Sequence, residues 1–373
     1  MSNFPKIGKP DYWLALAVFL LCLFGIVMIS SASIVVSGQH YGNNYYYVIH
    51  QLISLAIGLA VMVIAYLIDY RYWKKISLIL FLANLVLLIA VFLPGIGKSF
   101  GGAHRWIGFG SFLFQPSELV KLTFIIYLAS WLEKRGEKIR EFRLGFVPFV
   151  FLTVVLGFLI ISQPDLGTFI VIVATAVVTF FVAGAKSSHL LIGAGAAGVL
   201  LYILIKIAPY RLQRIFVFLN PSQQTLGAGY HINQALIAVG SGGLKGLGFG
   251  QSKQKYLYLP QPHTDSIFAI IAEELGFIRA GLVLLAYVFI GLRGFKIASY
   301  APDNFARLLA VGITSWLVLQ AFINIAAMMG LVPLTGIPLP FISFGGSSLI
   351  ISLWAIGILL NISKYSYLQD KLK

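Results

Sequence analysis

Charge is scarce in this sequence. Only 10% of its 373 residues are Asp, Glu, Lys or Arg, whereas 59% are hydrophobic, and the mean hydropathy is +0.91. A soluble protein needs far more charge to cover its surface. The composition therefore excludes a soluble fold, and in a membrane this length provides roughly ten spans of about 20 residues each.

Cysteine is nearly absent as well. Cys22, the one cysteine, lies in the first apolar run. A lone thiol excludes an intramolecular disulfide and a cysteine metal cluster, so we expect Cys22 to fill space in the core.

Acidic residues are outnumbered, 12 against 27 Lys and Arg, which gives a formal net charge of +15. No basic cluster alternates with stacking aromatics, so we expect no nucleic-acid partner. Most of the basic residues fall in connections that share one side of the membrane if the N-terminus is inside. The positive-inside rule therefore predicts that both termini are cytoplasmic.

Long apolar runs are what the sequence has in abundance. They predict an all-α, polytopic membrane protein with about ten transmembrane helices in one domain over 1–373. The first run has no small-residue cleavage site, so we expect it to be retained as a span. The runs cover 13–33, 50–69, 76–93, 117–132, 146–163, 166–184, 188–206, 266–290, 305–331 and 343–362.

The irregular sequence falls on the predicted outer side. It comprises loops at about 94–116, 207–265 (between helices seven and eight) and 332–342. Loops of this length are usually functional, whereas the cytoplasmic connections are short and basic. We therefore expect any chemistry on the outer face, with a short helix near 230–240 inside the longest loop.

Three Gln-Pro pairs precede apolar helices, in QPSEL (115–119), QPDLG (163–167) and QPHTD (261–265). Each has an acid within four residues of its Gln. Proline suits a first helical turn, where an acid offsets the helix dipole, so capping explains Glu118 and Asp165 as well as ligand binding does. Gln163 is a candidate for the same polar site.

Lys121 follows Glu118 by three residues, so the two side chains share a helix face and can pair. A lysine inside a span is costly unless it is paired or lines a polar cavity. Either Lys121 faces an anionic group in an outward cavity, or the pair is structural. Arg105 and Trp106, in the glycine-bearing stretch HRWIGFG, could hold a phosphate and a sugar-like face, although Trp is also common at membrane interfaces.

Glycine and serine are concentrated in two outer segments. Eight glycines occur between Gly227 and Gly250, close to Lys245, Lys253 and Lys255, as in a diphosphate-binding loop, although a flexible hinge explains them equally well. In PLPFISFGGSS (338–348), polar groups could satisfy exposed backbone or bind substrate. These are Ser343, Gly345, Gly346, Ser347 and Ser348.

The triplet His263, Thr264 and Asp265 ends the longest loop. Asp265 or Thr264 could cap the next helix, or Asp265 could act as a general base or bind a divalent ion. We expect Glu273 and Glu274, deeper in that helix, to pair with polar groups on other helices, Lys121 being one candidate.

Together these motifs resemble the SEDS (shape, elongation, division and sporulation) family of bacteria. The match is carried by HRWI, FQPSELVKL, QPDLGT, GSGGLKGLGFGQSKQKYLYLP, HTDSIFAIIAEELGF and GLVPLTGIPLPFISFGGSS, in order along nearly the whole chain. The form of the last two motifs is closer to the division branch, FtsW, than to the elongation branch, RodA. Two positions depart from the usual pattern: Phe344 stands where a tyrosine is usual, and Ser266 where Phe is more frequent.

The resemblance implies a ten-helix glycosyltransferase of the bacterial cytoplasmic membrane that polymerises lipid II into glycan strands. It would work with a class B penicillin-binding protein among the membrane proteins of the divisome or elongasome. The resemblance assigns Asp265 as the essential carboxylate, and Trp106, Glu118 and Lys121 match functionally important positions.

On this hypothesis Asp265 deprotonates the acceptor 4-hydroxyl, which displaces the diphosphate with inversion. Arg105, Lys121, Lys253 and Lys255 would stabilise the leaving charge, and no cofactor is required unless Mg²⁺ or Mn²⁺ assists. The main alternative is a lipid II flippase, for which a polar cavity inside a bundle would also suit. A structural scaffold would explain the helices but not the paired charges.

Overall fold

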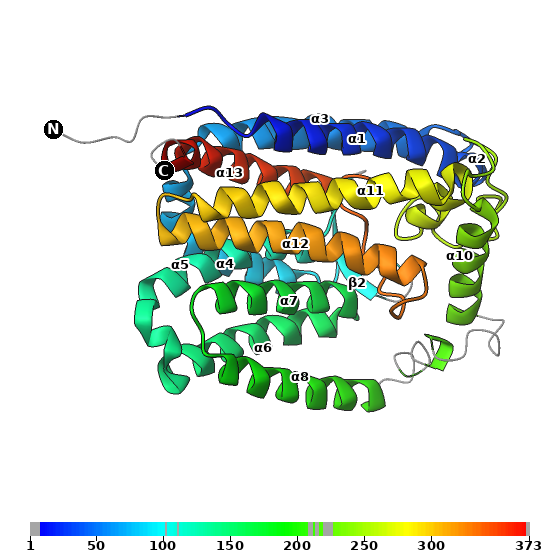
Figure 1. The fold of residues 1–373 in the computed structure, drawn as a ribbon. Coiled ribbons are helices and arrows are strands. Elements are labelled where there is room, and N and C mark those ends of the chain that lie inside the picture. Colours follow the sequence, from blue (N-terminus) through cyan, green and yellow to red (C-terminus); the bar gives the residue numbers. More distant parts are fainter. Residues whose placement is uncertain are drawn as a thin grey trace.

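The computed structural model describes residues 8–100, 103–109, 112–207, 212, 216–218 and 227–370. Long helices pack side by side in one bundle (Figure 1). Each of the ten apolar runs expected from sequence falls on one of them. They are α1 (Tyr12–Ala32), α3 (Tyr46–Leu67), α4 (Tyr70–Ala90), α5 (Pro116–Arg135), α6 (Val147–Ser162), α7 (Leu166–Val182), α8 (Ser187–Ile207), α11 (Ile267–Ser299), α12 (Asn304–Met328) and α13 (Gly346–Asp370).

Shorter elements join the long helices. α2 (Ile34–Tyr41) follows α1, and α10 (Ala228–Gly242) lies in the longest loop, where a helix near 230–240 is expected. A 3-10 turn (Gly136–Arg140) and a π turn (Phe142–Phe146) connect α5 to α6.

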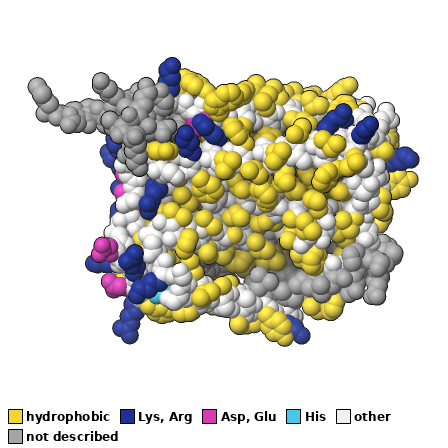
Figure 2. Space-filling model, viewed as in Figure 1, with side chains coloured by type: hydrophobic (Ala, Val, Ile, Leu, Met, Phe, Trp, Pro, Cys, Tyr) yellow, Lys and Arg dark blue, Asp and Glu magenta, His cyan; other side chains and the backbone are white. Residues whose placement is uncertain are grey.

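Seven helices in the described part of the chain are long and apolar enough to cross a membrane, and α7 and part of α8 are shorter apolar helices. Large apolar side chains such as Ile79, Phe158 and Leu191 are exposed on the flank of the bundle. Figure 2 shows hydrophobic side chains over one flank of the bundle, with charged ones gathered toward the ends. A surface of this kind needs lipid around it, so the protein is a multi-pass membrane protein. The total of ten crossings and the cytoplasmic placement of both termini remain predictions.

The centre of the bundle is formed by α12 and α13. In their apolar stretches, 78% and 83% of residues are buried, against 28% in α3. α13 packs closely along α3: a Cβ at Gly357 would come within 2.3 Å of the Met62 carbonyl oxygen. Polar residues on α12 and α13 are therefore shielded from lipid and can support a site.

The outer segment 94–116 is not an irregular loop, as expected from sequence, but a small antiparallel sheet. Its strands β1 (Gly97–Phe100), β2 (Ala103–Phe109) and β3 (Phe112–Phe114) pair in the order β1-β2-β3. Gly108, one of the glycines that favoured a loop, lies within β2, next to Ile107, which is buried and pairs with Phe114. The all-α description holds for the bundle and is incomplete here.

α11 is bent at Gly276, whose φ of 79° departs from helical geometry. Loop residues after α10 fit against the bend: Phe277 N donates to Gly243 O at 2.8 Å, and Leu247 N to Glu273 O at 3.0 Å. A Cβ at Gly276 would lie 2.2 Å from the Gly246 nitrogen, so only glycine fits. The kink thus fixes the outer loop to the helix that follows Asp265.

Candidate functional site

A cavity of about 300 Å³ lies among the first turns of α5, α7 and α13, beside β2 and the residues that precede α11. It brings together nine residues proposed from sequence: Arg105, Trp106, Glu118, Asp165, Thr264, Asp265, Gly345, Ser347 and Ser348. The remaining lining residues are Gln115, Thr168, Gln261, Gly336, Pro338 and Phe344. Three connecting segments, far apart in sequence, therefore converge on one space.

Asp265 is partly exposed to this cavity and does not cap α11. The helix begins at Ile267 with Ser266 at its N-cap position, so the capping explanation for Asp265 or Thr264 is wrong. Thr264 Oγ1 donates to Asp265 Oδ1 at 3.1 Å. The Ser266 hydroxyl donates to Pro260 O at 2.9 Å and lies 2.7 Å from His231 Nε2, so this departure from the family pattern ties α10 to the start of α11.

Glu118 and Lys121 form a buried ion pair on α5. Lys121 Nζ lies 2.8 Å from both Glu118 carboxylate oxygens and donates to Gln320 Oε1 at 2.8 Å. Both side chains are 2% exposed, yet only Glu118 lines the cavity. The pair is therefore structural, and the group that it presents to the cavity is the Glu118 carboxylate, not the Lys121 ammonium.

Asp165 both caps a helix and lines the cavity. Its Oδ1 accepts from Thr168 N at 3.2 Å at the start of α7. Beside it, Arg105 Nε donates to Gln163 O at 2.8 Å, and a second guanidinium nitrogen donates to Pro164 O. Gln163 itself is buried and donates to Leu88 O, so it supports the wall without lining the space. Two carbonyls thus fix the guanidinium of Arg105 at the cavity.

His263 forms an aromatic layer behind the cavity. Its ring lies 4.1 Å from that of Tyr47 and 5.7 Å from that of Phe344, which lines the space. Burial lowers the pKa of His263 to about 4, and nearby His40 adds to the effect. The imidazole is therefore neutral at pH 7. Phe344 retains the ring of the usual tyrosine.

Ser343 and Gly346 also lie behind the lining. Ser343 Oγ donates to Thr264 O at 2.6 Å and accepts from Leu339 N at 2.8 Å. Gly346 begins α13 with little room for a side chain, because a Cβ there would lie 2.7 Å from Ser54 Oγ. Both residues therefore hold backbone in place.

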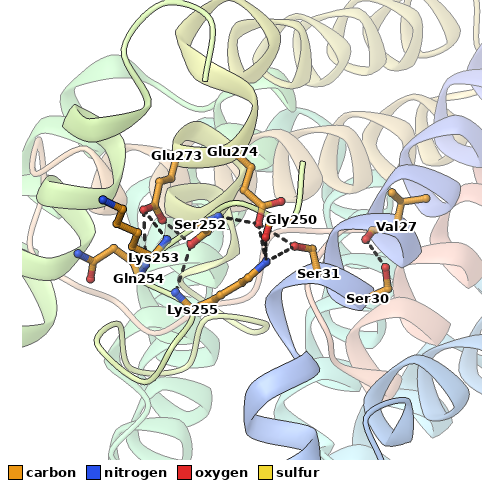
Figure 3. Close-up of polar contacts among 10 residues, drawn as sticks. All are labelled: Val27, Ser30, Ser31, Gly250, Ser252, Lys253, Gln254, Lys255, Glu273 and Glu274. Carbon is orange, nitrogen blue, oxygen red and sulfur yellow. Dashed lines mark hydrogen bonds and ion pairs between the residues drawn. The ribbon is translucent and has the colours of Figure 1, made fainter. Parts of the chain in front are cut away.

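Lys253 and Lys255 do not belong to this cavity lining. They lie in a separate group of polar contacts with Glu273, Glu274 and Ser31 (Figure 3). Lys255 is buried, and its Nζ contacts Glu274 Oε1 at 3.1 Å, Ser31 Oγ at 3.0 Å and Gly250 O at 2.6 Å. The Lys253 side chain is exposed, and its backbone N donates to Glu273 Oε1 at 3.0 Å. We call this group the loop clasp: Ser31, Ser252, Lys253, Lys255, Glu273 and Glu274.

The contacts of the loop clasp bear on two expectations from the sequence: the partners of Glu273 and Glu274, and the role of the glycine-rich segment. The expected pairing of Glu273 or Glu274 with Lys121 is wrong, because their partners come from the outer loop and α1. The neighbouring glycines pack against α11: a Cβ at Gly246 would lie 2.3 Å from Glu274 O. Their backbone is used to hold the loop, and none of them lines the cavity.

Several lining residues were missed from sequence although signals existed. Gln115 and Gln261 begin two of the three Gln-Pro pairs, where the nearby acids drew attention instead. Gly336 and Pro338 belong to the loop at 332–342, where Gln320 of α12 donates to Pro338 O. Thr168, one turn beyond Asp165, gave no signal of its own.

The charges of the cavity are unequal. Three carboxylates, from Glu118, Asp165 and Asp265, line it with one guanidinium, from Arg105. The N-termini of α5, α7 and α13 add partial positive charge. Within the described ranges no three His, Cys, Asp or Glu side chains are grouped so as to hold a metal ion. A divalent ion at Asp265 would therefore need most of its ligands from water and substrate, as Mg²⁺ often does.

Known proteins share both the sequence and the fold. Stage V sporulation protein E of Bacillus subtilis is 44% identical, over 97% of this chain and 99% of that protein. Probable peptidoglycan glycosyltransferase FtsW of Geobacter metallireducens is 40% identical, over 97% and 96%. A chain from a peptidoglycan synthase complex that coordinates polymerization and crosslinking superposes with a TM-score of 0.81 at 28% identity, covering 96% of this chain and 98% of that one.

The rod shape determining protein RodA of Thermus thermophilus gives a TM-score of 0.71 at 28% identity, covering 98% of this chain and 99% of that one. The family model for FtsW, RodA and SpoVE, described as cell cycle protein, matches residues 12–368. The resemblance seen in the motifs is therefore confirmed over nearly the whole length, and the chain belongs to the FtsW/RodA/SpoVE family.

Proposed function

We propose that this protein is a peptidoglycan glycosyltransferase that polymerises lipid II into glycan strands on the outer face of the bacterial cytoplasmic membrane. The observation that carries the proposal is the placement of Asp265. Its carboxylate lines a cavity at the end of the bundle, two residues before α11 begins. The peptidoglycan glycosyltransferase name carried by its FtsW relatives agrees with this function.

The cavity suits an activated sugar with an anionic leaving group. Lipid II carries its disaccharide on a polyprenyl diphosphate, and the fixed guanidinium of Arg105 with the neighbouring helix N-termini favours negative charge. Trp106, on the same strand, offers a flat apolar surface for a sugar ring. Arg105 would therefore bind the diphosphate, because Lys253 and Lys255 do not line the cavity.

Asp265 is the proposed general base. It takes the proton of the acceptor 4-hydroxyl, the oxygen attacks the donor anomeric carbon, and the bond to the diphosphate oxygen breaks with inversion. Glu118 pairs with Lys121, and one oxygen of Asp165 accepts from the N-terminus of α7. A base of this kind typically contributes about 10²–10⁴-fold in rate.

The partner we propose is a class B penicillin-binding protein that cross-links the new strand, within the division or elongation machinery. The likeness to a chain of a peptidoglycan synthase complex supports this assembly. The sporulation and FtsW names of the relatives leave the choice between septal and spore cell-wall synthesis to experiment. If Mg²⁺ or Mn²⁺ takes part, Asp265 and the diphosphate would share it.

The test is polymerisation of purified lipid II by the protein with its transpeptidase, comparing wild type with Asp265→Asn. Asn keeps an acceptor for Thr264 but cannot take a proton, so we expect glycan synthesis to fall at least about 10²-fold. The matched control is Asp69→Asn, an N-cap of α4 remote from the cavity, for which we expect wild-type activity.

The Asp265 assignment fails if the Asn variant, with an unchanged melting temperature, makes glycan at the wild-type rate. A wild-type complex that makes no glycan but moves lipid II across vesicle membranes would support the flippase alternative instead.

A further inference from the structure

Two amides on α12 link the parts of the cavity. Gln320 and Asn324 are one helical turn apart, project from one face and are each 1% exposed. Asn324 Nδ2 donates to Asp265 O and to Ile337 O, both at 2.8 Å. Gln320 Nε2 donates to Pro338 O at 2.8 Å. We call Gln320 and Asn324 the amide pair.

The other end of the Gln320 amide contacts the ion pair in the cavity wall. Its Oε1 accepts from Lys121 Nζ at 2.8 Å and from Trp316 Nε1 at 2.8 Å. Lys121 in turn holds both oxygens of Glu118. One turn of α12 therefore contacts the backbone of Asp265, the partner of Glu118, and the carbonyls of Ile337 and Pro338.

Each backbone carbonyl from His263 to Asp265 accepts a hydrogen bond from another part of the chain. His263 O accepts from Phe344 N at 2.9 Å, Thr264 O from Ser343 Oγ at 2.6 Å and Asp265 O from Asn324. Asp265 lies before the first turn of α11, in a local turn where Thr264 N and Ser266 N both donate to Gln261 O. The donors from α12 and from the segment before α13 connect this turn to the rest of the bundle.

We propose that the amide pair positions the reacting groups: Asn324 holds Asp265, and Gln320 holds the Lys121–Glu118 pair, at a fixed separation across the cavity. The inference rests on the proposed glycosyltransferase function. Burying two amides in the most buried part of the bundle is costly, the more so because Asn324 Oδ1 has no hydrogen-bond partner among the described residues, and apolar residues would hold α12 equally well. A displacement of about 1 Å at a reacting group can cost about 10²-fold in rate.

The two residues have separable effects. Asn324 acts on Asp265, so its loss lowers kcat for lipid II polymerisation. Gln320 acts on the wall that contacts bound substrate through Glu118, so its loss raises KM more than it lowers kcat.

The central experiment compares Asn324→Leu with wild type in steady-state lipid II polymerisation. Leu has a similar volume but no donor, so we expect kcat to fall about 10- to 100-fold with KM within about twofold. Gln320→Leu is expected to raise KM at least about fivefold with a smaller change in kcat.

Asn361 provides a matched control on α13, at the opposite end of the bundle. It is also a buried amide with two hydrogen bonds, donating to Tyr66 O at 2.8 Å and accepting from Tyr70 N at 2.9 Å. Asn361→Leu should lower the melting temperature about as much as Asn324→Leu while kcat stays at the wild-type value. If both variants lose kcat equally, the amide pair has only a structural role and the inference is wrong.

A second variant covers the case in which Asn324→Leu does not fold. Asn324→Ser keeps one hydroxyl donor, so we expect a folded protein with kcat between those of wild type and Leu. Full kcat in a folded Asn324→Ser and in any folded Asn324→Leu overturns the inference. In that case the proposed function would still hold if the wild-type protein polymerises lipid II and the Asp265→Asn variant does not. A wild-type protein that makes no glycan overturns the function itself.

Discussion

At the scale of the residue, His263 lies close to Asp265 but is not suited to proton transfer. It adjoins Asp265 in sequence, and its backbone carbonyl contacts Phe344 N at 2.9 Å. Its ring is buried between Tyr47 and Phe344, and burial holds its pKa near 4. A neutral imidazole cannot donate a proton as a general acid at pH 7, so its contribution is to pack the layer behind the cavity.

Burial of His263 makes the stability of the protein depend on pH. The folded-state pKa is about 4 and the ordinary value 6.5, so between these values the unfolded chain binds the additional proton. Stability is complete above about pH 6.5 and falls as the pH drops toward 4, by up to about 3 kcal/mol. Thermal unfolding from pH 7.5 to 4.5 should show a shallower decline for His263→Phe. Equal slopes in the two proteins would contradict this account.

Sequence could identify the polar residues of the cavity more readily than their separate roles. Glu118, Asp165 and Asp265 all follow a Gln-Pro pair, and capping and ligand binding remained equal explanations for the first two. The structure distinguishes them by partners: Lys121 for Glu118, the α7 N-terminus for Asp165, and Thr264 Oγ1 for Asp265. Each of these partners lies within three residues of its acid, whereas the cavity that all three acids line is formed by segments far apart in the chain, which residue spacing does not encode.

At the scale of the element, α11 is fixed to the outer loop by its two buried acids. Glu273 Oε1 accepts from Lys253 N and Gln254 N, and Glu274 Oε1 contacts Lys255 Nζ (Figure 3). Hydropathy predicted α11 and α10 well because both depend on local pattern. It could not predict the clasp, whose central ion pair joins residues 19 apart in the chain.

Breaking the clasp on one side should destabilise the protein strongly. Lys255→Met leaves Glu274 buried without its cation, which typically costs about 3–5 kcal/mol. The double variant Lys255→Met/Glu274→Gln removes the charge but keeps an acceptor for Ser31, so we expect most of the stability to return. Thermal unfolding measures the loss, and hydrogen exchange of residues 243–255 shows where it occurs.

Lys253→Met is the control for this prediction. The Lys253 side chain is exposed and the residue joins the clasp through its backbone N, so we expect a change within about 0.5 kcal/mol. A loss equal to that of Lys255→Met would show that net charge, and not the buried pair, stabilises the loop.

At the scale of the whole molecule, the cavity lies at the opposite end of the bundle from the start of α1 and the end of α13. Asp11 N donates to Ser363 Oγ at 3.0 Å, and Arg293 pairs with Asp11 at 2.7 Å, so the start of α1 and the last turns of α13 adjoin. α13 begins beside the cavity and ends next to the start of α1, at the opposite end of the bundle (Figure 1). If both ends are cytoplasmic, as the positive-inside rule predicts, the cavity opens on the outer side.

Cysteine labelling can test this orientation, because Cys22 is buried and should give little background. Tyr256, at the cavity end, is 58% exposed, and Lys138, in the turn after α5, is exposed at the opposite end. A membrane-impermeant maleimide should label Tyr256→Cys in intact spheroplasts and Lys138→Cys only after permeabilisation. The reverse pattern would place the cavity in the cytoplasm, where Asp265 could not extend a glycan strand outside the membrane. The same labelling result therefore tests both the orientation of the bundle and the proposed reaction.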